Sequence, residues 1–89
     1  MEAVITVVGR DMVGILAKVS GACAGANVNV EEVTQSILKD TFAMIMLVDI
    51  AKCNMPFQAF QKQLGEIGEG MNVDIHVTRQ ELFDAMHRI

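Results

Sequence analysis

The chain has 89 residues, 52% of them hydrophobic, and a formal net charge of −4 at pH 7. This length allows one domain, and because a domain so small buries only about 60–65% of its unfolded surface, the hydrophobic excess favours a subunit interface. The acidic balance counts against nucleic-acid binding, and the longest strongly apolar run, 42–48, is far too short to span a membrane.

The first third of the chain predicts a strand followed by a helix. Ala3–Val8 is apolar on both sides, as expected of a central strand covered on both faces. From position 14 the apolar spacing becomes helical, and Asp11 is the expected N-cap. The residues on the predicted buried face of this helix are Leu16, Val19, Cys23 and Ala26. Gly25-Ala26-Asn27 is expected to end it.

The middle of the chain predicts a hairpin of two strands, Val28–Leu38 and Thr41–Ile50, joined at Lys39-Asp40. The second of these strands is apolar on both sides and is expected to be a buried middle strand. Pro56 marks the start of a second helix, which Gly68 and Gly70 are expected to end. The following segment, 71–77, alternates in polarity and predicts a half-exposed fourth strand.

The predicted order β-α-β-β-α-β is that of an α+β ferredoxin-like sandwich, with the first and third strands in the middle of the sheet. Thr78 and Glu81 match a capping box, which predicts an added C-terminal helix over about 79–88. We expect this helix to cover the bare face of the sheet, in its own subunit or a neighbour's. The whole chain, 1–89, is expected to form a single domain.

The stretch "GRDMVGIL" at 9–16 joins the first strand to the first helix. It lacks the Lys and Ser/Thr that a P-loop needs after its second glycine, so a nucleotide is not expected. A helix N-terminus still suits a carboxylate, Gly14 admits close approach, and Asp11 could bind an ammonium group, which together favour an amino acid. Alternatively, Asp11 only caps the helix and Gly14 only permits tight packing.

The stretch "ITVVGRDMVGILAKVSGACAGANVNVEEVTQSIL" resembles an ACT domain, the small regulatory module of amino-acid metabolism. Over essentially all 89 residues the chain is similar to the stand-alone ACT-domain proteins of prokaryotes. The resemblance includes Asp11-x-x-Gly14-Ile15-Leu16, Asn27-Val28-Asn29-Val30 and Phe83-Asp84-Ala85-Met86. It implies a homodimer that binds an amino acid or a related metabolite between two copies and regulates an enzyme or regulator protein in trans.

By this resemblance the ligand lies between the loop of one copy and the second strand of its neighbour. The implied binding residues are Asp11, Met12, Val13 and Gly14 in the loop, and Asn27, Val28 and Asn29 at the strand entry. Many ACT loops carry Arg-Pro where this chain has Met12-Val13, and the loss of proline leaves φ unrestricted there. Gly9 also stands where some members have a polar side chain.

The sequence predicts no enzyme, because no nucleophile, base and orienting group occur together. His76 and Asp74 have no further ligand at metal-binding spacing, and no metal or other cofactor is expected. The N-terminus has no secretory pattern, so we expect a cytoplasmic protein with reduced cysteines. The rival interpretation is an interaction module without a ligand, which binds another protein through a sheet edge or the third helix.

Overall fold

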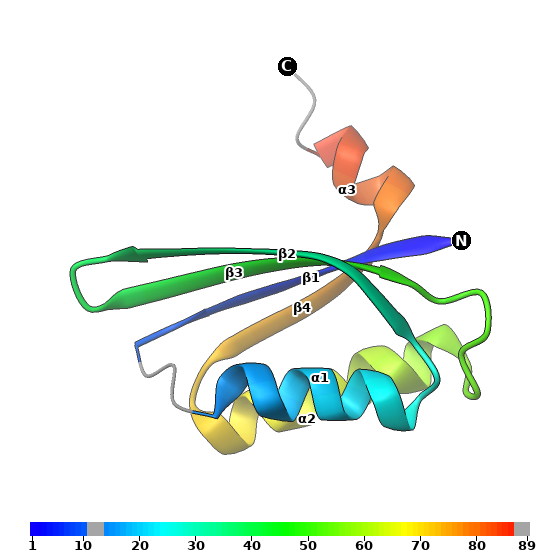
Figure 1. The fold of residues 1–89 in the computed structure, drawn as a ribbon, viewed down its shortest axis with the longest axis horizontal. Coiled ribbons are helices and arrows are strands. Elements are labelled where there is room, and N and C mark those ends of the chain that lie inside the picture. The colour runs from blue at the N-terminus through cyan, green and yellow to red at the C-terminus, as the bar shows by residue number, and fades with distance from the viewer. Residues whose placement is uncertain (11–13, 87–89) are drawn as a thin grey trace.

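A computed structural model describes residues 1–10 and 14–86 and shows a four-stranded sheet with helices (Figure 1). Its elements are β1 (Glu2–Gly9), α1 (Ile15–Gly25), β2 (Asn29–Leu38), β3 (Thr41–Asp49), α2 (Phe57–Met71), β4 (Asp74–Arg79) and α3 (Gln80–Met86). The predicted βαββαβ order with an added helix is therefore confirmed. None of the helices in the described residues is long and apolar enough to cross a membrane.

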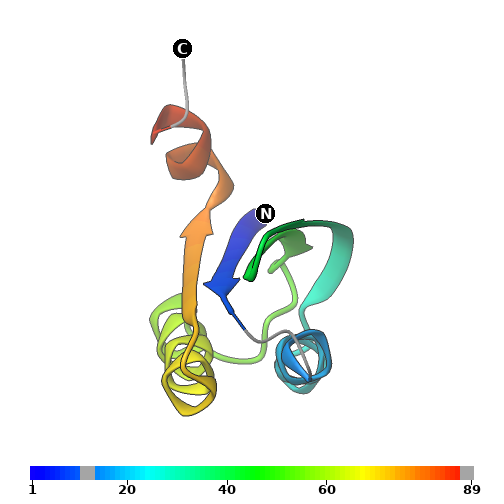
Figure 2. The ribbon, with the colours of Figure 1, turned by 90° about the vertical axis from the view of Figure 1, so that its left-hand side faces the viewer.

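The sheet has the strand order β2-β3-β1-β4, and every neighbouring pair is antiparallel. β1 and β3 occupy the middle, as predicted. Helices α1 and α2 lie side by side on one face, which we call the inner face (Figures 1 and 2). The turn between β2 and β3 is confirmed at Lys39, whose φ of 59° lies in the left-handed region that tight hairpin turns use.

The core lies between the inner face and the two helices. Alternate residues of the central strands point into it and are almost completely buried: Ala3, Ile5, Val7, Phe42, Met44, Met46 and Val48. From the helices, Val19 and Phe60 meet them with no exposed surface. The remaining residues of β1 and β3 face the outer side of the sheet, where Val8 and Ile45 are each 46% exposed. The prediction that β3 is buried on both faces is therefore wrong at Ile45.

Helix α1 differs from its prediction at the N-terminus. It begins at Ile15, and its N-cap position is occupied by Gly14, not by Asp11. The buried residue of the first turn is Ile15, whereas Leu16 is 42% exposed. Ile15 precedes Val19 by four positions and Leu16 precedes it by three, so the helical spacing is compatible with either residue on the buried face. In the structure only Ile15 is covered by the sheet.

Helix α2 continues past both glycines that were expected to end it. It extends to Met71, which was assigned to the fourth strand, and its C-cap is Asn72, with a φ of 59°. Gly68 lies where the helix crosses β4: a Cβ there would lie 2.8 Å from the Val73 carbonyl oxygen. The Val73 N–H also donates to the Gly68 carbonyl, at 2.9 Å. Gly68 thus permits close packing inside the helix.

Helix α3 packs against β1 and β4 at one end of the sheet (Figure 1). Its Leu82 and Met86 are 55% and 60% exposed. Most of the outer face, including Val8 and Ile45, is left uncovered. The helix was predicted to cover the bare face of the sheet. Within one subunit it covers only the end of the outer face where it contacts β1 and β4.

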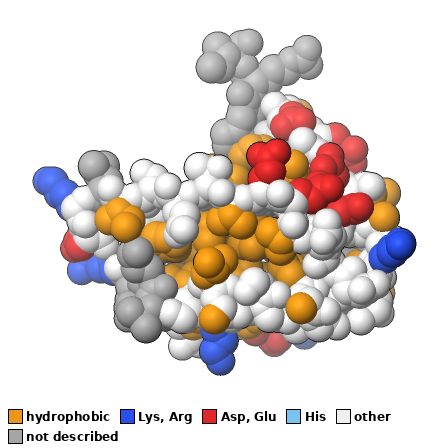
Figure 3. All heavy atoms as spheres, in the orientation of Figure 1, with side chains coloured by type: hydrophobic (Ala, Val, Ile, Leu, Met, Phe, Trp, Pro, Cys, Tyr) orange, Lys and Arg blue, Asp and Glu red, His pale blue; other side chains and the backbone are white. Residues whose placement is uncertain are grey.

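The β2 edge of the sandwich carries two exposed apolar side chains on its inner face. Val33 and Ile37 pair with Met46 and Phe42, so their side chains extend the inner face beyond the core, and they are 40% and 60% exposed. Leu16, in the first turn of α1, is exposed as well. Figure 3 shows the resulting apolar surface between β2 and α1. A long edge strand of this kind is a template for pairing with another chain.

Candidate functional site

The residues predicted to bind a ligand fall at the two ends of α1. Asp11, Met12 and Val13 lie outside the described residues, while Gly14 stands directly before the helix. Asn27, Val28 and Asn29 follow its other end. The helix has 11 residues, so at a rise of 1.5 Å per residue the two groups are about 16 Å apart. One subunit therefore does not bring them together.

Gly14 has the backbone geometry that the loop requires. Its φ is +79°, a left-handed conformation that costs glycine little and other residues more. Gly14 is exposed, and among the described residues a Cβ at this position would meet no atom within 4 Å. The Gly14 carbonyl accepts from the Lys18 N–H at 2.9 Å. The backbone here starts the helix and leaves room beside it.

Asn27 and Val28 have structural roles at the other end. Asn27 takes a φ of 60°, and its side-chain nitrogen donates to the Lys52 carbonyl at 2.9 Å. In return Asn54 donates from its side chain to the Gly25 carbonyl at 3.0 Å. These bonds tie the loop after β3 to the turn after α1. Val28 is buried, so of the three strand-entry residues Asn29 is the one with a free polar side chain.

Asn29 lines a hollow of about 200 Å³ together with Asp49 and Lys52. It pairs with Asp49 across β2 and β3, so the two side chains lie on the same face. No side-chain hydrogen bond joins Asn29 to another residue in the described part of the chain. The hollow thus offers an amide, a carboxylate and an ammonium group.

Asp49 is held in its charged form. Its Oδ1 accepts from the Ala51 N–H at 2.9 Å, and this hydrogen bond is the main reason that the pKa of Asp49 is lowered. The amino nitrogen of Met1, 3.6 Å away, and the charge of Lys52 act in the same direction. Asp49 and Lys52 were not predicted from the sequence. The sequence did contain a signal for Asp49: it is a charged residue at the end of an apolar strand, opposite Asn29 in the predicted hairpin.

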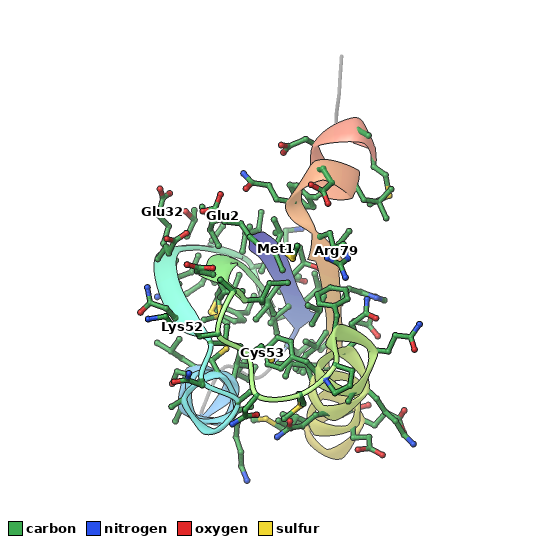
Figure 4. All side chains as sticks on the ribbon, turned by 90° about the vertical axis from the view of Figure 1, so that its right-hand side faces the viewer. Met1, Glu2, Glu32, Lys52, Cys53 and Arg79 are labelled. Carbon is green, nitrogen blue, oxygen red and sulfur yellow. The ribbon has the colours of Figure 1, made fainter. Side chains whose placement is uncertain are left out.

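Further acidic side chains gather at the same end of the molecule. Glu31 lies at a bulge in β2. The pKa of Glu31 is raised, mainly because its carboxyl group is hydrogen-bonded to that of Glu2. Figure 4 views this end of the molecule, with Glu2 and Glu32 labelled. Among residues 1–10 and 14–86, no three His, Cys, Asp or Glu side chains are grouped so that they could hold a metal ion.

The βαββαβ fold with its glycine-started helix agrees with a comparison against known families. A family model described as "ACT domain" matches residues 2–78. The chain belongs to the ACT-domain family. The match confirms the resemblance seen in the sequence. An ACT domain is a regulatory ligand-binding module.

Two similar proteins match this chain over essentially its whole length. A UPF0237 protein of Listeria monocytogenes serotype 4b is 42% identical over 89 residues, which is 100% of both chains. The structure of an ACT domain protein from Streptococcus pneumoniae has a TM-score of 0.81 and 33% identity, and covers 98% of each chain. The regulatory subunit of aspartate kinase from Thermus thermophilus shares the fold, with a TM-score of 0.64 and 24% identity over 85% of this ACT domain and 49% of that chain.

Proposed function

We propose that the protein is a homodimeric sensor that binds an amino acid, or a closely related metabolite, between its two copies and acts on a partner protein in trans. The observation that carries this proposal is that Gly14 and Asn29, two of the residues predicted to bind the ligand, lie at opposite ends of α1. A two-fold axis beside the middle of α1 would exchange the ends of the helix. The loop of each copy would then lie next to Asn29 of the other.

The β2 edge supports such an axis. Two β2 strands related by a two-fold axis run antiparallel and can pair through their free backbone groups. Val33 and Ile37, which extend past the core, would be covered by α1 of the other copy, and Leu16 would be covered as well. Pairing at this edge therefore buries the exposed apolar surface and completes two equivalent sites in one step.

The charges at the hollow favour a zwitterion. The Asp49 carboxylate suits the ammonium group of an amino acid, and Lys52 and the Asn29 amide suit its carboxylate. The backbone N–H groups at the start of the neighbouring α1 would add a second contact for a negative group. A hollow of about 200 Å³ has space for a small amino acid.

The comparisons support a regulatory role. ACT domains generally bind small metabolites, and a structure similar to this chain is named as the regulatory subunit of an aspartate kinase. We propose that ligand binding shifts an equilibrium between conformations or assembly states of the dimer, and that an enzyme or a regulator protein responds to this shift.

A thermal-shift screen against the twenty amino acids and the common 2-oxo acids tests the proposal. A ligand present at about 100 times its Kd stabilises the native state by about 2.7 kcal/mol, which raises the Tm by several degrees or more. We expect selective shifts with amino acids, and smaller ones with the 2-oxo acids, which lack the ammonium group. Asn29→Ala should abolish the shift, while Ser36→Ala, an exposed change on the same strand face, should preserve it. The absence of a shift with every compound would contradict the proposal.

One observation favours the rival function, a ligand-free interaction module: α3 presents exposed Leu82 and Met86. If this helix binds a partner protein without any small ligand, partner binding should be lost in Leu82→Glu and unchanged in Asn29→Ala. The sensor proposal requires the partner to respond to ligand in the wild type and not in Asn29→Ala. A pull-down with and without amino acids, using both variants, separates the two.

A further inference from the structure

A second hollow lies at the end of the sandwich where β1 starts and β4 ends. It measures about 180 Å³ and is lined by Met1, Ile50, Cys53, Met55, Phe57 and Arg79. Figure 4 looks at this end of the molecule, with Met1 and Arg79 close together above Cys53. Apart from Arg79, the side chains of the described lining residues are apolar or weakly polar. The amino group of Met1 is charged but pairs with Asp49. The Arg79 guanidinium is therefore the charged side chain that this part of the chain brings to the hollow.

The Arg79 guanidinium is held in place by weak partners. Its Cζ lies 4.6 Å from the centroid of the Phe57 ring, a cation–π contact. Its Nη1 donates to the sulfur of Met1 at 3.2 Å, and a thioether is a poor acceptor. Within the described residues no carboxylate forms an ion pair with Arg79. Most of its five N–H donors therefore remain available while the group is fixed beside an apolar hollow.

We propose that this hollow, which we call the end site, binds a small aliphatic carboxylate. The carboxylate would accept hydrogen bonds from Arg79, the arrangement in which such bonds are strongest, and the hydrocarbon tail would lie among Ile50, Met55 and Phe57. A cavity of about 150 Å³ holds a benzene molecule. The end site is slightly larger, at about 180 Å³, and accommodates an acid with a tail of about four to six carbons.

The charge at this end sets a requirement on the ligand. The side chains of Glu2, Asp49, Glu81 and Asp84 border a neighbouring hollow on the outer side of the sheet, which also includes Met1. They repel an anion, so the apolar tail must contribute much of the binding. A longer or branched tail should therefore bind more tightly than acetate.

The end site is separate from the hollow that contains Asn29. The loop after β3 lies between them: Lys52 lines the Asn29 hollow, whereas its neighbour Cys53 lines the end site. Figure 4 shows Lys52 on the side of β2 and α1, away from Arg79. The two hollows share no lining residue among those described, so the end site is distinct from the proposed amino-acid site.

Methionine methyl groups provide a direct test, because Met1 and Met55 line the end site and Met44 lies in the core. Protein labelled with ¹³C at the methionine methyls is titrated with acetate, butanoate, pentanoate and 3-methylbutanoate, and with pentanamide as the uncharged match. We expect the Met1 and Met55 resonances to shift in a saturable way with the longer acids, with Met44 unchanged. Equal affinity for pentanamide and pentanoate, or no saturable shift, would overturn the proposal.

Three variants identify the groups responsible. Arg79→Gln should raise the Kd for pentanoate about tenfold, and Arg79→Lys should restore part of the loss. Cys53→Leu, which fills the hollow and leaves Arg79 in place, should abolish binding. Asn29→Ala should leave pentanoate binding unchanged. A failure of the end-site proposal can therefore be told apart from a failure of the proposed amino-acid site. Unaltered pentanoate binding by folded Cys53→Leu would place the acid elsewhere and refute the end site.

Discussion

Replacing Gly68 by alanine tests the packing of α2 against β4. In an open helix position glycine costs about 1 kcal/mol relative to alanine, so the change would normally be stabilising. At Gly68 the new Cβ would lie 2.8 Å from the Val73 carbonyl oxygen and 3.0 Å from Ile75 Cγ1. Val73 leads into β4 and Ile75 lies on the buried face of that strand, so relief requires α2 and β4 to separate. Overpacking of this kind costs about 1–3 kcal/mol, and we expect a net destabilisation of about 1–2 kcal/mol.

Gly65, one turn earlier on the same helix, is the matched control. A Cβ there meets no atom within 4 Å, and Gly65→Ala should stabilise the protein by about 0.5–1 kcal/mol. Urea unfolding of both variants at one protein concentration gives the comparison, and the Tm of Gly68→Ala should fall by about 4 °C or more. If Gly68→Ala were as stable as Gly65→Ala, the close approach of α2 to β4 would be refuted.

Two further predictions concern the β2 edge and the cysteines. Ile37→Lys should convert the proposed dimer to a monomer in sedimentation, whereas Thr34→Lys, on the outer face of the same strand, should leave that dimer intact. If both variants sedimented as dimers, pairing at this edge would be contradicted. Burial raises the pKa of the Cys23 thiol to about 11 from an ordinary value of 9.0. An unfolded chain therefore releases this proton first, and the free energy of unfolding should fall as the pH rises from about 9 to about 11. Cys23→Ala should remove that part of the pH dependence in parallel urea titrations, and an unchanged dependence would contradict the burial argument.

Most of the fold could be predicted from the sequence because hydrophobic periodicity reports which face of each element is buried. The alternation in β1 and β3 and the Phe60–Leu64 spacing in α2 correspond to the observed core. The errors occur where a local signal competes with packing. Gly68 resembles a helix terminator, yet it lies within α2. Glycine is needed at this position because Val73 and Ile75 leave no room for a side chain.

The candidate site could be predicted only in part, because its residues meet through the tertiary structure. Asn29 stands out by its place at the start of β2, and the family resemblance points to it. Asp49 joins it only through the antiparallel pairing of β2 and β3, and Lys52 only through the loop that Asn27 holds. A one-dimensional pattern does not encode such pairings.

Complementation between two defective variants tests most directly the proposal that two subunits share each site. Gly14→Val alters the loop and Asn29→Ala alters the strand entry, so neither homodimer should bind the amino acid that stabilises the wild type most. When the two chains are unfolded together and refolded, random pairing makes half of the dimers mixed, and each mixed dimer has one intact site. Isothermal titration calorimetry should then find about a quarter of the wild-type sites. No recovery of binding in the mixture would place the site within a single subunit and contradict the account.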